Sequence, residues 1–187
     1  GTVDDLCCGI GGDTVALAER CTVTAIDARR SATQMAAWNA EVHGVAENVV
    51  TQVADVEQHP GSSPLLHIDP DRRSGAKRSV RIENYQPGPP FLESLMETRT
   101  GGAIKLSPAS NFGGKFPGCE VELISLDGEC KEATVWFGSL AGDGLWRATV
   151  LPSGETLAAD PLSARAMVTP PGKFVYDPDP SVVRSGL

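Results

Sequence analysis

No uninterrupted apolar run in this 187-residue sequence approaches the roughly 20 residues that a transmembrane helix needs, so we expect no membrane-spanning segment. No pair among the five cysteines has the C-x-x-C spacing of zinc and redox sites. We therefore expect no metal centre, and reduced thiols in a cytoplasmic protein. Internal repeats are also missing, which argues against a repeat array.

Basic residues are in the minority, because 16 Lys and Arg face 24 Asp and Glu for a net charge of −8. A surface of this sign repels nucleic acid as a whole, so contact with RNA or DNA requires a local basic patch. Hydrophobic residues make up 41% and charged residues 21%, which excludes general disorder. The length predicts one domain with a core and room for a small appendage.

Strand-like and helix-like segments alternate over the first part of the chain. Such alternation predicts right-handed β-α-β crossovers and a parallel sheet. The expected fold class is α/β, with a Rossmann-like, doubly wound and mostly parallel seven-stranded sheet, a C-terminal antiparallel hairpin and a small β extension. The expected strands are residues 3–8, 22–26, 49–53, 65–68 and 103–106, and the expected helices are 13–20, 31–43 and a third that begins after Pro89-Pro90.

The pattern changes after Pro117. Asp127-Gly128 and Pro152-Ser153-Gly154 each lie between two strand-like segments and predict hairpins. We expect an α/β domain over residues 1–140, which begins at a core strand and lacks upstream elements. A β-hairpin extension follows over 141–160. Residues 161–187 are rich in proline and predict a linker or the start of a truncated accessory domain.

A glycine loop follows the first strand and opens the first helix, with Gly9, Gly11 and Gly12 in the sequence Asp5-Leu6-Cys7-Cys8-Gly9-Ile10-Gly11-Gly12-Asp13. Glycine lets the backbone turn sharply and approach a ligand at a helix N-terminus. Asp27 ends the next strand, where a carboxylate can accept hydrogen bonds from both ribose hydroxyls of an adenosine.

These residues, followed in order by Asp55 and Asp69-Pro70, resemble the class I S-adenosylmethionine-dependent methyltransferases. The resemblance implies S-adenosylmethionine as cofactor. It places Asp5 and Gly9 near the methionine end, Asp27 near the ribose and Asp55 near the adenine. The alternative is a Rossmann-like sheet whose glycines serve only the turn.

The segment after the fourth strand, Asp69-Pro70-Asp71-Arg72, is similar to the Asp/Asn-Pro-Pro-aromatic tetrad of amino-group methyltransferases. Arg72 occupies the aromatic position, and an arginine can also stack on a base. We expect Asp69 to take the proton from the acceptor, with Asp71 as second choice. Lys105 is a candidate to line the acceptor pocket. His67, within an apolar strand, is predicted to be a hydrogen-bonded core residue.

Five basic residues lie within a ten-residue stretch that follows this strand end: Arg72, Arg73, Lys77, Arg78 and Arg81. A local positive stripe on an acidic chain predicts contact with an RNA backbone, and a solvated loop is the alternative.

The chain is most similar to the trimethylguanosine-synthase-like and THUMP-associated RNA methyltransferases, in residues 5–13 and in Ala36-Ala37-Trp38-Asn39-Ala40. This resemblance implies methylation of RNA, and it makes residues 174–187 a candidate for the start of an RNA-binding portion. Two alternatives stay open. One is a small-molecule methyltransferase, and the other is a non-catalytic module that binds the cofactor or RNA.

Overall fold

The computed structural model describes residues 1–74, 77–163, 168–170 and 172–187, with the backbone alone for 73–74 and 77–78. The strands are β1 (Thr2–Leu6), β2 (Thr22–Asp27), β3 (Val49–Val53), β4 (Leu65–Ile68), β5 (Arg73–Ser74), β6 (Lys77–Arg78), β7 (Gly101–Leu106), β8 (Glu120–Leu126), β9 (Glu129–Gly138), β10 (Trp146–Leu151) and β11 (Glu155–Ala159). The helices are α1 (Gly12–Ala18), α2 (Arg30–Val42), α3 (Pro89–Thr98) and α4 (Pro180–Ser185), with the short 3-10 helices η1 (Ala46–Asn48) and η2 (Ile82–Asn84).

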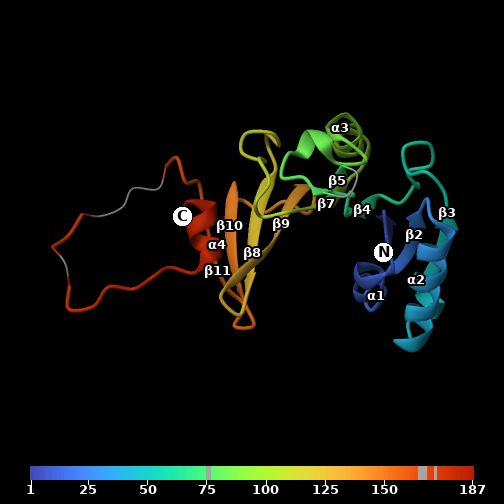
Figure 1. The fold of residues 1–187 in the computed structure, drawn as a ribbon, viewed down its shortest axis with the longest axis horizontal. Coiled ribbons are helices and arrows are strands. Elements are labelled where there is room, and N and C mark those ends of the chain that lie inside the picture. Colours follow the sequence, from blue (N-terminus) through green and yellow to red (C-terminus); the bar gives the residue numbers. More distant parts are fainter. Residues whose placement is uncertain (75–76, 164–167, 171) are drawn as a thin grey trace.

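Among the described residues, nine strands form one sheet in the order β11-β10-β8-β9-β7-β4-β1-β2-β3, which runs across the whole molecule (Figure 1). The five strands from β7 to β3 are parallel to one another. β9 is antiparallel to both β7 and β8. The predicted α/β fold, with its mostly parallel sheet and late antiparallel hairpin, is therefore confirmed.

Helices cover both faces of the parallel half, with α1 and α2 on one face and α3 on the other (Figure 1). Side chains alternate accordingly along the strands. Leu6 and Ile26 belong to the larger core with the buried leucines of α3, whereas Val3 and Val23 pack against Ala18 of α1. Fully burying one such aliphatic side chain stabilises the fold by about 1.5–3 kcal/mol. β1, β2, β4 and β7 are thus covered on both faces, whereas β3 at the edge of the sheet has no buried residue.

The helix α2 packs on the sheet through small residues and turns its large ones to solvent. The large apolar residues Met35, Trp38 and Val42 face outward, and Trp38 is 56% exposed. The inner face of α2 carries small residues because it packs closely on the glycine loop. A Cβ on Gly11 would lie only 2.7 Å from the Cβ of Ala36. The buried residues of this helix are Ala32, Thr33, Ala36 and Ala40.

The first strand and helix are shorter than the sequence predicts. β1 ends at Leu6 because Cys7 adopts a left-handed conformation, with φ 58°, that turns the chain into the loop. α1 begins at Gly12 and ends at Ala18, where the expected range was 13–20. None of the helices in the described part of the chain is both long and apolar enough to cross a bilayer.

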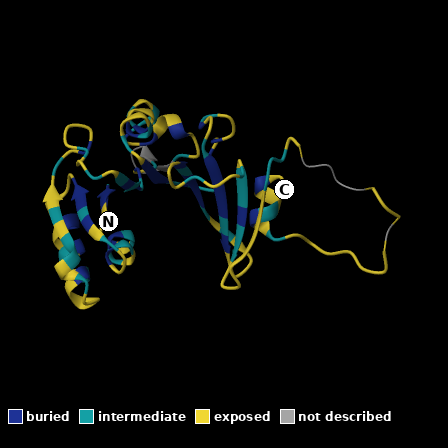
Figure 2. Ribbon diagram, turned by 180° about the vertical axis from the view of Figure 1, so that it is seen from behind, coloured by how far each residue is buried: buried dark blue, intermediate teal, exposed yellow. Residues whose placement is uncertain are grey.

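The second hairpin continues the main sheet, because β10 pairs in parallel with β8 and β11 pairs antiparallel with β10. The described residues between β11 and α4 form an exposed excursion (Figure 2). α4 then returns to pack against β8 and β10. Arg184 of α4 donates to the carbonyl oxygens of Pro108 and Ser110 at 2.6 and 2.9 Å and lies 4.7 Å from the centre of the Phe112 ring.

Candidate functional site

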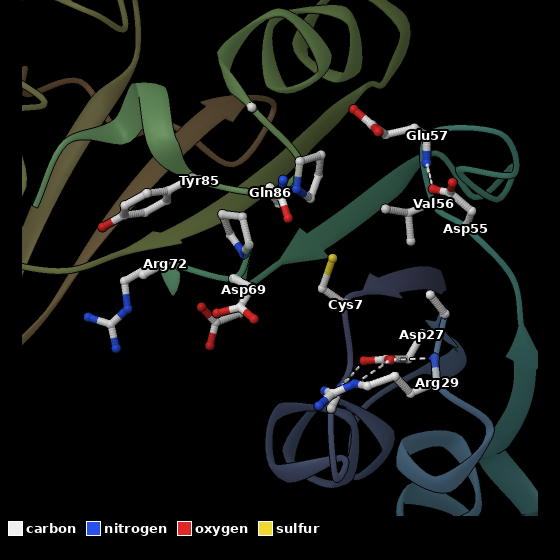
Figure 3. A pocket seen from close by; sticks show the side chains of 16 residues that line it. Cys7, Asp27, Arg29, Asp55, Val56, Glu57, Asp69, Arg72, Tyr85 and Gln86 are labelled. Atoms are coloured by element: carbon white, nitrogen blue, oxygen red, sulfur yellow. Dashed lines mark hydrogen bonds and ion pairs between the residues drawn. The ribbon is translucent and has the colours of Figure 1, made fainter. Parts of the chain in front are cut away.

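A cleft of about 870 Å³ opens at the carboxyl ends of β1, β2, β3 and β4 (Figure 3). Strands β2 and β3 lie on one side of β1 and β4 on the other, so the cleft occupies the point where the strand order reverses, the usual ligand site of open α/β sheets. It is lined by Cys7, Gly9, Asp27, Ala28, Arg29, Asp55, Val56, Glu57, Asp69, Pro70, Asp71, Arg72, Tyr85, Gln86, Pro87 and Gly88.

The glycine loop forms one wall of this cleft. Gly9 and Gly11 have φ angles of 57° and 85°, which side chains other than glycine rarely tolerate. Nothing lies within 4 Å of a Cβ built on Gly9, so the backbone there faces open space. Gly9 lines the cleft, whereas Gly11 and Gly12 are not among the lining residues and instead carry the turn into α1.

Asp27, at the end of β2, ties the loop to the neighbouring turn. One of its carboxylate oxygens accepts the Gly9 N–H at 3.0 Å. The other accepts the Arg29 N–H at 2.9 Å and the Arg29 side-chain Nε at 3.3 Å. Asp27 is 6% exposed, and Figure 3 shows its carboxylate beneath Cys7 with Arg29 alongside. A buried acid fixed in this way presents a defined acceptor to a ligand hydroxyl.

Asp55 lies beyond the end of β3, on the opposite side of the cleft from Asp69 (Figure 3). It is exposed, and its carboxylate accepts the backbone N–H of Glu57 at 3.0 Å and the side-chain amide of Gln58 at 3.3 Å. The buried Val56 between Asp55 and Glu57 supplies an apolar contact beside these acids. Asp27 and Asp55 therefore lie on the same rim of the sheet, as predicted.

Asp69 and Asp71 follow β4 and line the other end of the cleft. The backbones of Asp71 and Gln86 exchange two hydrogen bonds, at 2.8 and 2.9 Å, which bring the 85–88 segment to the cleft. Tyr85 is buried there and shares a 2.5 Å hydrogen bond with Ser110. The polar groups from these two segments make this end of the cleft suited to an acceptor molecule.

Burial raises the pKa values of two acidic groups that line the cleft, Cys7 and Asp69. Burial, assisted by the negative charges of Asp27, Asp69 and Asp5, raises the pKa of the Cys7 thiol to about 12, so this cysteine is a neutral thiol and not a nucleophile at neutral pH. Burial also raises the pKa of Asp69, against the opposing charge of Lys105. A carboxyl group whose pKa is raised is a better proton acceptor once it is ionised.

Asp5 lies beneath the glycine loop and is not among the residues that line the cleft. Its carboxylate accepts a hydrogen bond from Thr14 and contacts His67 Nδ1 at 2.8 Å. His67 is thus hydrogen-bonded within the fold, as predicted. The nearness of Asp5 to the cofactor stays a prediction, because its contacts support the loop from below.

Of the five clustered basic residues, Arg72 lines the cleft and Arg81 is exposed outside it. The backbone between them forms a two-stranded ribbon in which Arg73 pairs with Arg78. The side chains of Arg73, Lys77 and Arg78 lie outside the described residues, so their contact with RNA stays a prediction.

The first half of the chain matches a family model. Residues 1–93 match the family described as RNA cap guanine-N2 methyltransferase. Two relatives, from two strains of Mycobacterium tuberculosis, are 36% identical to this chain over 195 residues. Both are described as uncharacterized S-adenosylmethionine-dependent methyltransferases. In sequence and fold, the chain is similar to the class I S-adenosylmethionine-dependent methyltransferases.

The alignments with these methyltransferases cover 99% of the chain but 52% of each relative, so the chain spans about half the length of the curated relatives it matches. A solved structure from Porphyromonas gingivalis W83, assigned as a methyltransferase, superposes with a TM-score of 0.74 at 18% identity. It covers 99% of this chain and 51% of the other, and at that identity it supports the fold alone.

Sequence reasoning missed several residues of this cleft. Arg29 and Glu57 each lie two positions beyond a predicted acid, and the strand-end pattern carries no signal for them. Tyr85 and Gln86 belong to the segment that reaches the cleft through the pairing of Gln86 with Asp71. Lys105, a predicted lining residue, is not among those that line the cleft, because its ammonium contacts Asp13 beneath the loop at 3.0 Å.

Proposed function

We propose that the protein is an S-adenosylmethionine-dependent methyltransferase that acts on RNA. The observation that carries the proposal is the cleft at the strand-order reversal, where Gly9, Asp27, Asp55 and Asp69 come together from four strand ends. Its volume of about 870 Å³ lies within the range of small-molecule and cofactor sites.

The residues present fit the cofactor. Open space in front of Gly9 gives room beside the loop backbone. Asp27 offers buried carboxylate oxygens for the two ribose hydroxyls. These hydroxyls would replace the hydrogen bond from the Arg29 side chain to Asp27. Asp55 is exposed at the far side and offers an acceptor for the adenine amine. When bound, S-adenosylmethionine supplies a methyl group that its sulfonium makes electrophilic.

The chain's own contribution is positioning and proton transfer. Asp69 and the 85–88 segment would hold the acceptor beside the methyl group that the cofactor supplies. The proton released by the acceptor goes to the Asp69 carboxylate. Asp71, exposed at the same end, is the second candidate for that proton.

Two features support RNA as the substrate. The first is the family match over residues 1–93, whose description names an RNA cap guanine. The second is the run of basic residues that begins at Arg72 in the cleft and continues along the β5–β6 ribbon. On a chain with net charge −8, this run is the local positive segment that an RNA backbone would need.

Isothermal titration calorimetry with S-adenosylhomocysteine tests the cofactor part. We expect binding by the wild type and a loss of about tenfold to a hundredfold in affinity for Asp27→Ala, because hydrogen bonds to a charged group contribute about 1.5–3 kcal/mol. Asp143→Ala, at an exposed acid before β10, is the matched control and should bind as the wild type does. Absence of binding by the wild type would remove the basis of the proposal.

A small-molecule acceptor is the second candidate, and the charge of the cleft favours it. Five carboxylates line the cleft against two guanidinium groups, those of Arg29 and Arg72, which suits a neutral or cationic acceptor better than a phosphate backbone. A tritiated-methyl assay on total RNA and on a small-molecule extract distinguishes the two, because label should enter only one of them.

A further inference from the structure

Lys105 is the centre of a cluster of charges that includes the first turn of α1. Its ammonium lies 3.0 Å from Asp13, 3.4 Å from Glu132 and 3.9 Å from Asp69. These four side chains come from β7, α1, β9 and the segment after β4, so the tertiary fold brings them together. All are half-buried or nearly so, and Lys105 is 25% exposed.

Strand alternation explains why the cluster forms on this face. Ile104 and Leu106 of β7 enter the larger core, which turns Lys105 to the opposite face, the one that α1 covers. Ala133 and Val135 of β9 likewise enter that core, which turns Glu132 toward Lys105. The first turn of α1 then places Asp13 over the lysine, with both carboxylate oxygens within 3.1 Å.

Lys105 is also the only cation in the described part of the chain that forms an ion pair with Asp69. An ammonium has three N–H donors, and three carboxylates surround this one. Without the lysine, the ammonium would no longer balance the negative charges of Asp13 and Glu132. The smaller influences of His67 and Arg72 would remain to oppose them. Mutual repulsion and partial burial would then favour the protonated, inactive form of Asp69.

We propose that Lys105 is a positioning residue that keeps Asp69 ionised and oriented at the acceptor end of the cleft. Through Asp13 it also links the first turn after the glycine loop to the proton acceptor. This inference rests on the proposed function, because it assigns Asp69 the proton of the acceptor. Lys105 itself is not among the residues that line the cleft.

Several other charged groups act on Asp69. Asp13 of α1 raises its pKa, whereas His67 of β4 and Arg72 of the cleft lower it. The negative charge of Asp69 in turn raises the pKa of the Cys7 thiol, which follows β1. A measurement on Asp69 itself is therefore needed, since an activity profile would combine all of these effects.

The test follows the side-chain carboxyl carbon of Asp69 by NMR through a pH titration of protein carrying ¹³C-labelled aspartate, with Asp69→Asn used for assignment. In Lys105→Met the pKa of Asp69 should rise by about one unit, as expected for loss of an opposite charge within 4–6 Å. Lys105→Arg keeps the charge and should restore a value close to that of the wild type. Asp13→Asn should move the pKa in the opposite direction, downward.

Lys115→Met is the matched control, because it also removes a lysine from an ion pair, here with the exposed Glu83. It should leave Asp69 unchanged. An unaltered Asp69 pKa in Lys105→Met would overturn the proposal, and so would the same pKa shift in the arginine and methionine variants. If Lys105→Met fails to fold, the direction of the Asp69 pKa shift in Asp13→Asn still tests the proposal. The titration uses no cofactor or RNA, so a failure of the proposed function would appear separately, as absence of S-adenosylhomocysteine binding.

Discussion

Individual residues around the glycine loop are constrained by contact as much as by chemistry. Gly11 combines a φ angle of 85° with a backbone that lies against Ala36, whereas Gly12 is helical and has nothing within 4 Å of a Cβ built on it. Two adjacent glycines of one motif thus have different physical roles. The motif pattern in the sequence does not distinguish them.

Alanine substitutions separate these roles. Gly11→Ala should lower the free energy of unfolding by about 2 kcal/mol or more, since the methyl group is strained at that φ and meets Ala36 at 2.7 Å. Gly12→Ala is the control and should be neutral or stabilising by up to about 1 kcal/mol, because it removes a glycine from a helix. Urea unfolding measures both, and equal effects of the two substitutions would contradict this account.

The buried pair of His67 and Asp5 predicts a pH dependence. Burial opposes protonation of His67, but the hydrogen bond and charge of Asp5 outweigh it, so the pKa of His67 is raised. A raised pKa contributes stability that is complete below the unfolded-state value of about 6.5 and is lost as the pH rises through the folded-state value. The stability difference between wild type and His67→Gln should therefore be larger at pH 6 than at pH 8.5.

Urea unfolding at the two pH values measures that difference, with His59→Gln at an exposed histidine as control. The control should show the same small difference at both. A His67→Gln difference that stays constant or grows toward pH 8.5 would show that the pair is not charged in the folded protein.

At the scale of elements, α4 is held by its cap and its contacts, since six residues make a helix too short to be stable alone. Asp179 accepts hydrogen bonds from the backbone and side chain of Ser181 at 2.8 and 2.7 Å and from Ser125 of β8 at 2.5 Å. Hydrogen bonding to Ser125, the largest influence, lowers the pKa of Asp179. The cap therefore fastens α4 to the sheet as well as starting the helix.

Asp179→Ala should increase the opening of α4 by roughly 5- to 30-fold, which corresponds to the 1–2 kcal/mol typical of a lost N-cap. Amide hydrogen exchange of the α4 backbone measures this opening. Asp177→Ala, in the exposed segment just before the helix, is the control and should leave exchange unchanged. Equal exchange in both variants would mean that α4 is held by Arg184 and not by its cap.

At the scale of the molecule, the charge distribution makes RNA binding depend on a short segment. Neutralising Arg72, Arg73, Lys77 and Arg78 together should reduce the slope of log affinity against log salt for single-stranded RNA by about two to three, since each phosphate contact contributes about 0.7. Fluorescence anisotropy with a labelled oligonucleotide measures the slope. A control that neutralises four exposed basic residues elsewhere uses Arg20, Arg30, Lys131 and Lys173.

The control should keep the wild-type slope. If the two quadruple variants behave alike, the RNA contact is not local to residues 72–81, and the small-molecule alternative gains support.

Much of this architecture follows from short-range sequence patterns, because a β-α-β alternation fixes which strand ends meet at one rim. Asp27, Asp55 and Asp69 could therefore be placed in the cleft from the sequence. The Lys105 cluster could not, because it depends on the register between β7 and β9 and on a helix that begins 93 residues earlier. The α4 helix carries a detectable signal, an aspartate cap followed by proline, but the surrounding prolines obscure it.

The central claim is that the rim formed by β1 to β4 holds the adenosyl cofactor, and a crystal structure of the complex with S-adenosylhomocysteine tests it most directly. The account predicts both ribose hydroxyls within hydrogen-bond distance of Asp27, the adenine beside Asp55, and the sulfur between Gly9 and Asp69. A ligand bound elsewhere, or one in the cleft with its ribose turned away from Asp27, would contradict it.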